Sequence, residues 1–339
     1  MAIDTAYFSV KCRWLSMIAA FAVVGQHSVT WLWVPEVADW AANLQKAVTL
    51  HLKFAVPLFL ALSGYWFMKS YVRYGYLQLL CRKIRSLYVP FLLCCVIGEI
   101  AVWATSLWAS TSPSFKGLLY APFLVTKDLN LAFHLWYIRA LLIIFIAAPL
   151  FWHVSRRPLL IVLAFVATRF FPVVEAGPYC FQCIATVIPY FLLGAALSER
   201  DWLAIRLSPR ISLCITLTVA LFLLALDCCT EWRIPHVVDS QELRAFLCTA
   251  AVWFAYDALP MPKKTVNWLK YSFFIYLVHV SVIRFSGNIF RVAFDPYDPC
   301  VRTVGYVANF LVFFAALGMG WLCERYLPRL YRLLSGGRG

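Results

Sequence analysis

The stretch WLSMIAAFAVVGQHSVTWLWV, residues 14–34, decides the fold class of this chain. It runs for 21 residues without a lysine, arginine, aspartate or glutamate. A helix needs roughly 20 apolar residues to cross the hydrocarbon core of a bilayer, so this stretch has the length and composition of a transmembrane helix. It is too long for the apolar region of a cleavable signal and lacks a small-residue exit, so we expect it to remain as the first span.

Composition extends this interpretation to the whole chain. Of 339 residues, 63% are hydrophobic and 14% are charged, and the mean hydropathy is +0.77. Soluble domains usually have about 45–50% apolar and about 25% charged residues. We therefore predict one all-α domain, residues 1–339, built as a polytopic transmembrane bundle of about ten spans. The predicted spans are 14–34, 48–68, 87–108, 132–152, 158–172, 183–198, 211–229, 245–260, 268–287 and 302–323.

The basic residues set the predicted orientation of the bundle. Eighteen of the 30 lysines and arginines fall in six alternate segments outside these spans. Because cytoplasmic loops carry the excess of lysine and arginine, both chain ends are predicted to be cytoplasmic. The net charge of +14 then reflects topology and does not indicate a nucleic-acid partner. The six segments are 1–13, 69–86, 153–157, 199–210, 261–267 and 324–339.

The twelve cysteines show no zinc-like spacing with histidine, so no metal is expected. Cys180 and Cys183, and likewise Cys228 and Cys229, fall in or near segments predicted to lie outside the membrane. These four cysteines could form a disulfide in an oxidising compartment, and they are equally compatible with free buried thiols.

His27 is the strongest functional candidate, because an ionisable side chain at membrane depth is expensive. It lies 14 residues beyond Arg13, which is about 21 Å along a helix. An imidazole takes and returns a proton near neutral pH and so suits general-base chemistry. A histidine with a purely structural role, hydrogen-bonded to a neighbouring helix, fits the same spacing.

Three arginines are the next candidates. Arg139 is predicted to lie inside the fourth span, where its charge has to face a polar cavity or an acidic partner such as Glu99 or Asp227. Arg82 and Arg85 stand one helical turn apart at the cytoplasmic start of the third span, a spacing that suits a phosphate. Ordinary positive-inside anchoring explains the same pair.

Several segments together resemble the acyltransferase 3 family of integral membrane acyltransferases. The resemblance covers roughly residues 10–325 and follows the family's order and spacing. It rests on IAAFAVVGQHS (18–28), VPLFLALSGYWF (56–67), the Arg82–Arg85 pair, HLWYIR (134–139), IPYFLLG (188–194) and SFFIYLVH (272–279).

The resemblance implies an enzyme of the bacterial cytoplasmic (inner) membrane. Members of the family are expected to take an acyl group, usually acetyl, from cytoplasmic acyl-CoA and to pass it to a hydroxyl of a surface glycan or a lipid-linked sugar. The implied partners are therefore acyl-CoA, a glycan or lipid-linked acceptor and membrane lipid, with no metal and no nucleic acid.

The resemblance also implies roles for individual residues. His27 corresponds to the family's membrane histidine and is expected to be the catalytic base, while Arg82 and Arg85 correspond to its Arg-x-x-Arg motif and are expected to hold the donor phosphates. The remaining candidates are Arg139, Tyr137 and Ser63 for the developing oxyanion, Arg13 for the donor, and His134, Trp136 and His279 for the acceptor.

The start of the first span departs from the family pattern. Where the family commonly has Asp-x-Leu-Arg-x-Ile-Ala, this chain reads RWLSMIA over residues 13–19. Arg13 thus stands at the position of the acid, and Ser16 at the position of the arginine. Either the donor site is arranged differently in this chain, or Arg13 restores the lost positive charge one turn earlier.

A transporter or flippase of a glycan or lipid intermediate is the alternative function. Intramembrane histidine and arginine serve transport as well as catalysis. The sequence shows neither two related halves nor a pair of interrupted helices of the kind that many transporters have, so acyl transfer is favoured.

Overall fold

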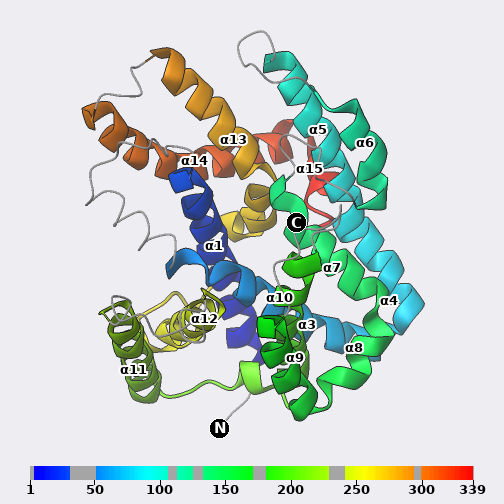
Figure 1. Ribbon diagram of the computed structural model, residues 1–339, viewed down its shortest axis with the longest axis vertical. Helices are drawn as coiled ribbons and strands as arrows, with labels where there is room; N and C mark the ends of the chain where they lie inside the picture. Colours follow the sequence, from blue (N-terminus) through cyan, green and yellow to red (C-terminus); the bar gives the residue numbers. More distant parts are fainter. Residues whose placement is uncertain are drawn as a thin grey trace.

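The computed structural model describes residues 4–30, 51–105, 113–124, 133–170, 181–228, 241–293 and 299–338 (Figure 1). Every element within these ranges is helical, which confirms the predicted all-α class. The longer helices are α1 (Thr5–Thr30), α3 (Ala55–Tyr74), α5 (Val89–Thr105), α7 (Trp136–Ile146), α9 (Pro158–Phe170), α10 (Phe181–Leu197), α11 (Pro209–Cys228), α12 (Gln241–Ala258), α13 (Ser272–Ala293) and α14 (Pro299–Tyr326). The shorter elements are α4 (Tyr76–Lys83), η1 (Ile84–Tyr88), α6 (Phe115–Tyr120), η2 (Ala121–Phe123), η3 (Phe133–Leu135), α8 (Ala148–Ser155), η4 (Trp202–Ala204), η6 (Asn267–Tyr271) and α15 (Pro328–Leu334).

Three helices among the described residues are long and apolar enough to cross a membrane. They are Thr5–His27, Tyr76–Ala104 and Pro209–Leu226. In the last of these only 11% of the apolar window is buried, so most of its hydrophobic surface faces outward, as a lipid-facing helix requires. The membrane character of the chain is thereby supported, while the count of about ten spans and the cytoplasmic chain ends stay predictions.

The predicted span 132–152 is not one straight helix. Helices α7 and α8 are bent by 81° at a short break. Ala147 separates them, and a proline stands within the first two positions of α8. Proline lacks a backbone N–H and clashes with the preceding turn, so it starts a helix far better than it continues one.

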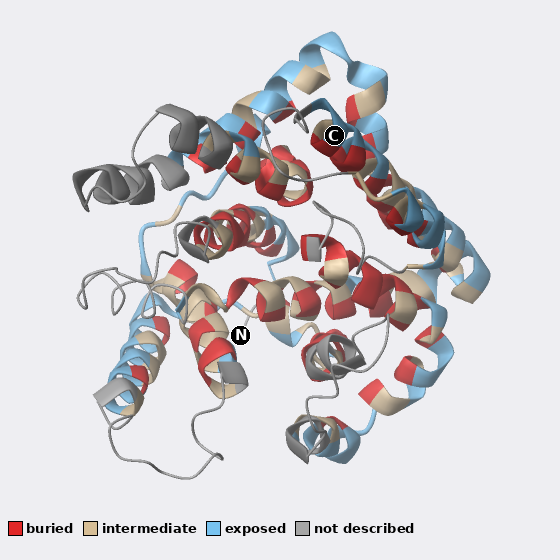
Figure 2. Ribbon diagram, turned by 45° about the horizontal axis from the view of Figure 1, so that its top comes forward, coloured by how far each residue is buried: buried red, intermediate tan, exposed pale blue. Residues whose placement is uncertain are grey.

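Helix α1 runs through the middle of the molecule (Figure 1). It contacts α3 on one side and α13 and α14 on the other. Buried residues gather on the central helices, while exposed ones mark the periphery (Figure 2). The outer helices α5 and α11 present exposed leucine, isoleucine, valine and tryptophan side chains, a surface suited to lipid.

A buried ion pair fixes the first part of α1 against α12. Lys11 Nζ lies 2.8 Å from Asp257 Oδ2, and the two side chains are only 2% and 1% exposed. The Tyr7 hydroxyl donates to Asp257 Oδ1 at 2.7 Å. The Lys11 ammonium also lies 4.0 Å from the centre of the Trp253 ring. Each charge is therefore matched by a partner, as a charge removed from water requires.

Helices α3 and α10 approach closely because each carries a glycine that faces the backbone of the other helix. A methyl group at Gly64 would lie 2.0 Å from the Phe191 carbonyl oxygen, and one at Gly194 would lie 1.9 Å from the Ala61 carbonyl oxygen. Small residues of this kind allow the backbones of membrane helices to touch. The contact sets the position of Ser63, the residue next to Gly64.

We predict that Gly194→Ala weakens the fold, because the added methyl group forces α3 and α10 apart. Overpacking costs about 1–3 kcal/mol or more, so the melting temperature of the purified protein in detergent should fall by several degrees. Gly318→Ala is the matched control, since a methyl group there meets no described atom within 4 Å. Equal melting temperatures of the two variants would contradict the close-approach argument.

Candidate functional site

A cavity of about 580 Å³ lies between α1, α3, α7, α13 and the C-terminal tail. Its volume falls within the roughly 300–1,000 Å³ of small-molecule sites. We call it the polar cavity, because cationic and hydroxyl side chains line it beside apolar ones. Its cationic residues are Arg13, Lys83, Lys270 and Arg338.

Two hydroxyl groups meet at the wall of the polar cavity. Ser63 from α3 and Tyr137 from α7 lie with their oxygens 3.3 Å apart. Both were predicted as oxyanion donors from widely separated motifs. The close approach of α3 to α10 and the packing of α7 in the core bring them together.

Three histidines from three separate elements form a row. The ring of His27, on α1, lies 5.2 Å from that of His279 on α13. The ring of His134, in η3, lies 4.9 Å from His279. His279 Nδ1 lies 2.7 Å from the Tyr276 carbonyl, and His134 Nε2 lies 3.1 Å from the Leu277 carbonyl. We call His27, His279 and His134 the histidine row.

Tyr276 connects the histidine row to the polar cavity. It lines the cavity, and its hydroxyl donates to the His134 carbonyl at 2.7 Å. Its ring lies 5.8 Å from the ring of Tyr137 and 5.9 Å from that of His279. His27 itself does not line the cavity, so one aromatic side chain stands between the cavity and the nearest histidine.

Of the arginines predicted to bind the donor, one lines the polar cavity and two do not. Arg13 lines the polar cavity together with Ser16, so the residues that depart from the family pattern share this wall. Arg82 and Arg85 are exposed and line no part of the cavity. Arg82 lies 3.7 Å from the centre of the Tyr74 ring. Lys83, which stands between them in sequence, borders the cavity instead.

Two further candidates lie away from the polar cavity. Arg139 is buried in α7, and Trp136 is half-buried with its ring 6.4 Å from that of Tyr137. Of the acids considered as partners of Arg139, Glu99 accepts a hydrogen bond from the Ser114 backbone N–H at 2.7 Å. The side chain of Asp227 lies outside the described residues.

Sequence reasoning missed Lys270 and Arg338 as cavity residues. Lys270 is in η6, directly before the SFFIYLVH segment, and its ammonium forms an ion pair with Glu324 of α14. Its position next to a family motif is the sequence feature that could have identified Lys270 as a candidate. Arg338 follows the last helix and was counted only among the basic residues that set the orientation.

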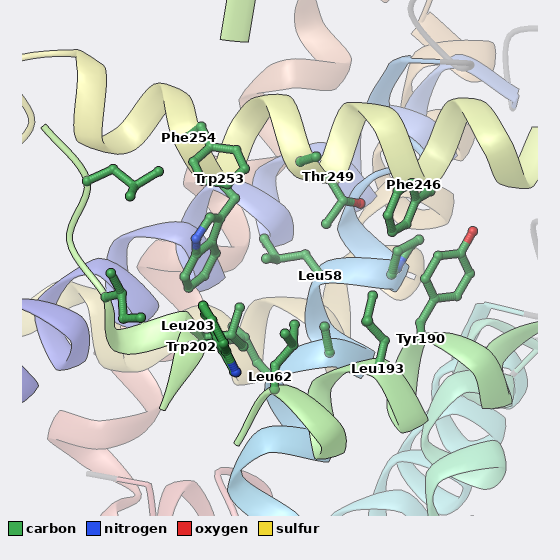
Figure 3. A pocket seen from close by; sticks show the side chains of 16 residues that line it. Leu58, Leu62, Tyr190, Leu193, Trp202, Leu203, Phe246, Thr249, Trp253 and Phe254 are labelled. Atoms are coloured by element: carbon green, nitrogen blue, oxygen red, sulfur yellow. The ribbon is translucent and has the colours of Figure 1, made fainter. Parts of the chain in front are cut away.

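A second cavity of about 370 Å³ is apolar (Figure 3). Leu58 and Leu62 of α3, Leu193 of α10 and Trp253 of α12 point into it. No ionisable acid or base from the described residues lines it apart from the phenol of Tyr190. It is therefore suited to hydrocarbon, and the polar cavity is the candidate site for chemistry.

The described residues show no metal-binding group, and they do not include the side chains of the cysteines for which a disulfide and free thiols were both considered. No group of three histidine, cysteine, aspartate or glutamate side chains among them is arranged to hold a metal ion, and the histidine row is no exception. Cys180 and Cys229, and the side chains of Cys183 and Cys228, lie outside the described residues.

A family of known proteins matches this chain. The model of a family described as an acyltransferase domain matches residues 13–325. A search of the curated proteins and a search of the solved structures returned no match.

We predict that Tyr276→Phe loosens the wall between the polar cavity and the histidine row. The variant keeps the ring but leaves the buried His134 carbonyl without its donor, which costs about 1–3 kcal/mol. The expected result is a lower melting temperature in detergent. Tyr326→Phe is the control, because Tyr326 is 69% exposed and its loss of a hydroxyl should change nothing. A Tyr276→Phe variant as stable as the parent would show that this hydrogen bond does not hold the wall.

Proposed function

The chain belongs to the acyltransferase domain family, and on this premise we propose that it transfers an acetyl group from cytoplasmic acyl-CoA to a hydroxyl of a cell-surface or lipid-linked glycan. Family membership and the apolar helices make it a membrane acyltransferase. The donor, the acetyl group, the acceptor, the ten-span topology and the bacterial inner membrane are parts of the proposal.

The main observation that supports this proposal is the polar cavity. It joins a cationic region to two hydroxyl groups and, through Tyr276, to the histidine row. Acyl-CoA carries groups that suit both kinds of residue, since its phosphates are anionic and its thioester has a carbonyl oxygen. Arg13, Lys83 and Arg338 belong to segments predicted to be cytoplasmic, which is the side on which acyl-CoA is available.

The proposed reaction uses His27 as the general base. In this proposal the acceptor hydroxyl binds beside His27 from the outer side, and the Tyr276 side chain moves aside so that the thioester reaches it from the polar cavity. The imidazole takes the proton of the hydroxyl while the oxygen attacks the thioester carbonyl carbon. The tetrahedral intermediate collapses, the carbon–sulfur bond breaks, and the CoA thiolate leaves and takes the proton back from His27. The products are an O-acetyl ester and free CoA, so atoms and charge balance.

The hydroxyls of Ser63 and Tyr137 are the proposed donors to the oxyanion. They border the cavity and are fixed by packed helices, and preorganised donors of this kind stabilise charge that develops in the transition state. His279 contacts the rings of both other histidines, so its proposed role is to position His27. Arg139, buried on the same helix as Tyr137, does not line the cavity and has no part in the proposed reaction.

We expect acetyl-CoA to stabilise the purified protein. A ligand that binds only the folded state stabilises it by about 2.7 kcal/mol at 100 times its dissociation constant. The measurement is the melting temperature in detergent with and without acetyl-CoA, with adenosine as a control for weak nucleoside binding. No shift at millimolar acetyl-CoA would favour a transporter over an acyltransferase.

We expect His27→Ala to lower acyl transfer in membranes by about 10²–10⁴-fold, which is the usual contribution of a general base. Transfer of a radiolabelled acetyl group from acetyl-CoA is the readout, normalised to the amount of folded protein.

His153→Ala is the matched control, since His153 is exposed on α8 and away from the polar cavity. It should leave the rate unchanged. Normal turnover by folded His27→Ala would rule out the catalytic role of this histidine.

A further inference from the structure

We propose that the C-terminal tail after α15 is part of the donor site, and that Arg338 binds a phosphate group of acyl-CoA together with Lys83 and Arg13. The inference rests on the proposed function and adds a binding residue to it.

The tail has a defined course into the polar cavity. Helix α15 ends with Gly336 at φ +62° and Gly337 at φ +75°. The Gly336 N–H donates to the Leu333 carbonyl at 3.3 Å, and the Gly337 N–H donates to the Arg332 carbonyl at 3.0 Å. This pair of bonds is the Schellman motif, in which left-handed glycines end a helix and turn the chain sharply.

The turn is packed directly against η1. A methyl group at Gly336 would lie 2.2 Å from the carbonyl oxygen of Ser86, so only glycine fits this position. Ser86 follows Lys83 by three residues, and the contact therefore brings the tail beside Lys83. Helix α15 also contacts α5, the helix that follows η1 directly (Figure 1).

Arg338 is held in place while its charge stays available. Its guanidinium carbon lies 3.9 Å from the centre of the Phe273 ring, and Nη1 donates to the Ser335 carbonyl at 3.3 Å. The residue as a whole keeps exposed surface and borders the polar cavity, while protein surrounds most of its guanidinium. The surrounding protein lowers the pKa of Arg338 to about 10 by burial, so it is still charged at neutral pH.

Two of the cations that line the cavity are not balanced by acids among the described residues. Lys83 and Arg338 are close enough to repel each other. Lys270 is paired with Glu324, but in the described part of the chain no carboxylate forms an ion pair with Lys83 or Arg338. A bound anion would relieve the repulsion and complete the site.

Phosphate is the anion that best fits this arrangement. A guanidinium presents a planar fork that matches phosphate oxygens, and a nearby ammonium adds a point charge. Acyl-CoA carries a pyrophosphate and a ribose phosphate, so several cations are needed to hold it. The hydroxyls of Ser63 and Tyr137 line the same cavity, which the thioester arm would enter.

The test is the affinity of purified full-length protein for acetyl-CoA and for acetyl-pantetheine, which carries no phosphate. Arg338→Gln should raise the dissociation constant for acetyl-CoA about 10-fold or more, as expected for a lost hydrogen bond to a charged group. Affinity for acetyl-pantetheine and the melting temperature without ligand should not change. Arg338→Lys should keep part of the affinity. Arg332→Gln replaces an exposed arginine of α15 that does not line the polar cavity, and it should match the parent protein.

Each outcome decides between the two proposals. If the parent protein binds acetyl-CoA and Arg338→Gln binds it equally well, the role of Arg338 is wrong and the proposed function stands. Tighter binding by Arg338→Gln would also overturn it, because the tail would then obstruct the cavity. If the parent protein binds neither thioester, the proposed function fails, and the role of Arg338 fails with it.

Discussion

The salt bridge between Lys11 and Asp257 is the interaction on which the position of α1 depends. Both groups are almost fully buried, so either charge left alone would be strongly destabilising. The pair therefore holds α1 against α12 at one end, while the middle of α1 packs on α13 and α14. Because α1 carries Arg13, Ser16 and His27, the same anchor sets one wall of the polar cavity and the start of the histidine row.

The site is assembled from segments that are far apart in the chain. Helix α3 brings Ser63 to the cavity because its neighbour Gly64 lets α10 approach from the other side. Helix α13 supplies both Tyr276, which closes the wall, and His279, which joins the other two histidines. A polar candidate site is thereby placed within an apolar bundle, and contacts between helices join its parts.

Much of this arrangement was predictable from sequence, and the exceptions have physical reasons. The all-helical fold followed from apolar stretches of membrane length, and the motifs singled out Ser63, Tyr137, His134 and His279. Arg82 and Arg85 were expected at the donor site, but residues on a helix rotate by about 100° each. When Lys83 faces the cavity, its neighbours at 82 and 85 are turned away from it. Arg338 reaches the site through a contact with η1, more than 200 positions earlier in the chain, and no local pattern encodes such a contact.

Leu62 lines both the polar cavity and the apolar cavity. The two spaces are thus divided at this point by a single aliphatic side chain, one residue before Ser63. A side chain of this kind has rotamer freedom but a fixed volume, so room gained on one side is lost on the other. Hydrocarbon bound between α3, α10 and α12 would therefore contact the same side chain that borders the polar cavity next to Ser63, so occupancy of the apolar cavity would change the space available in the polar one.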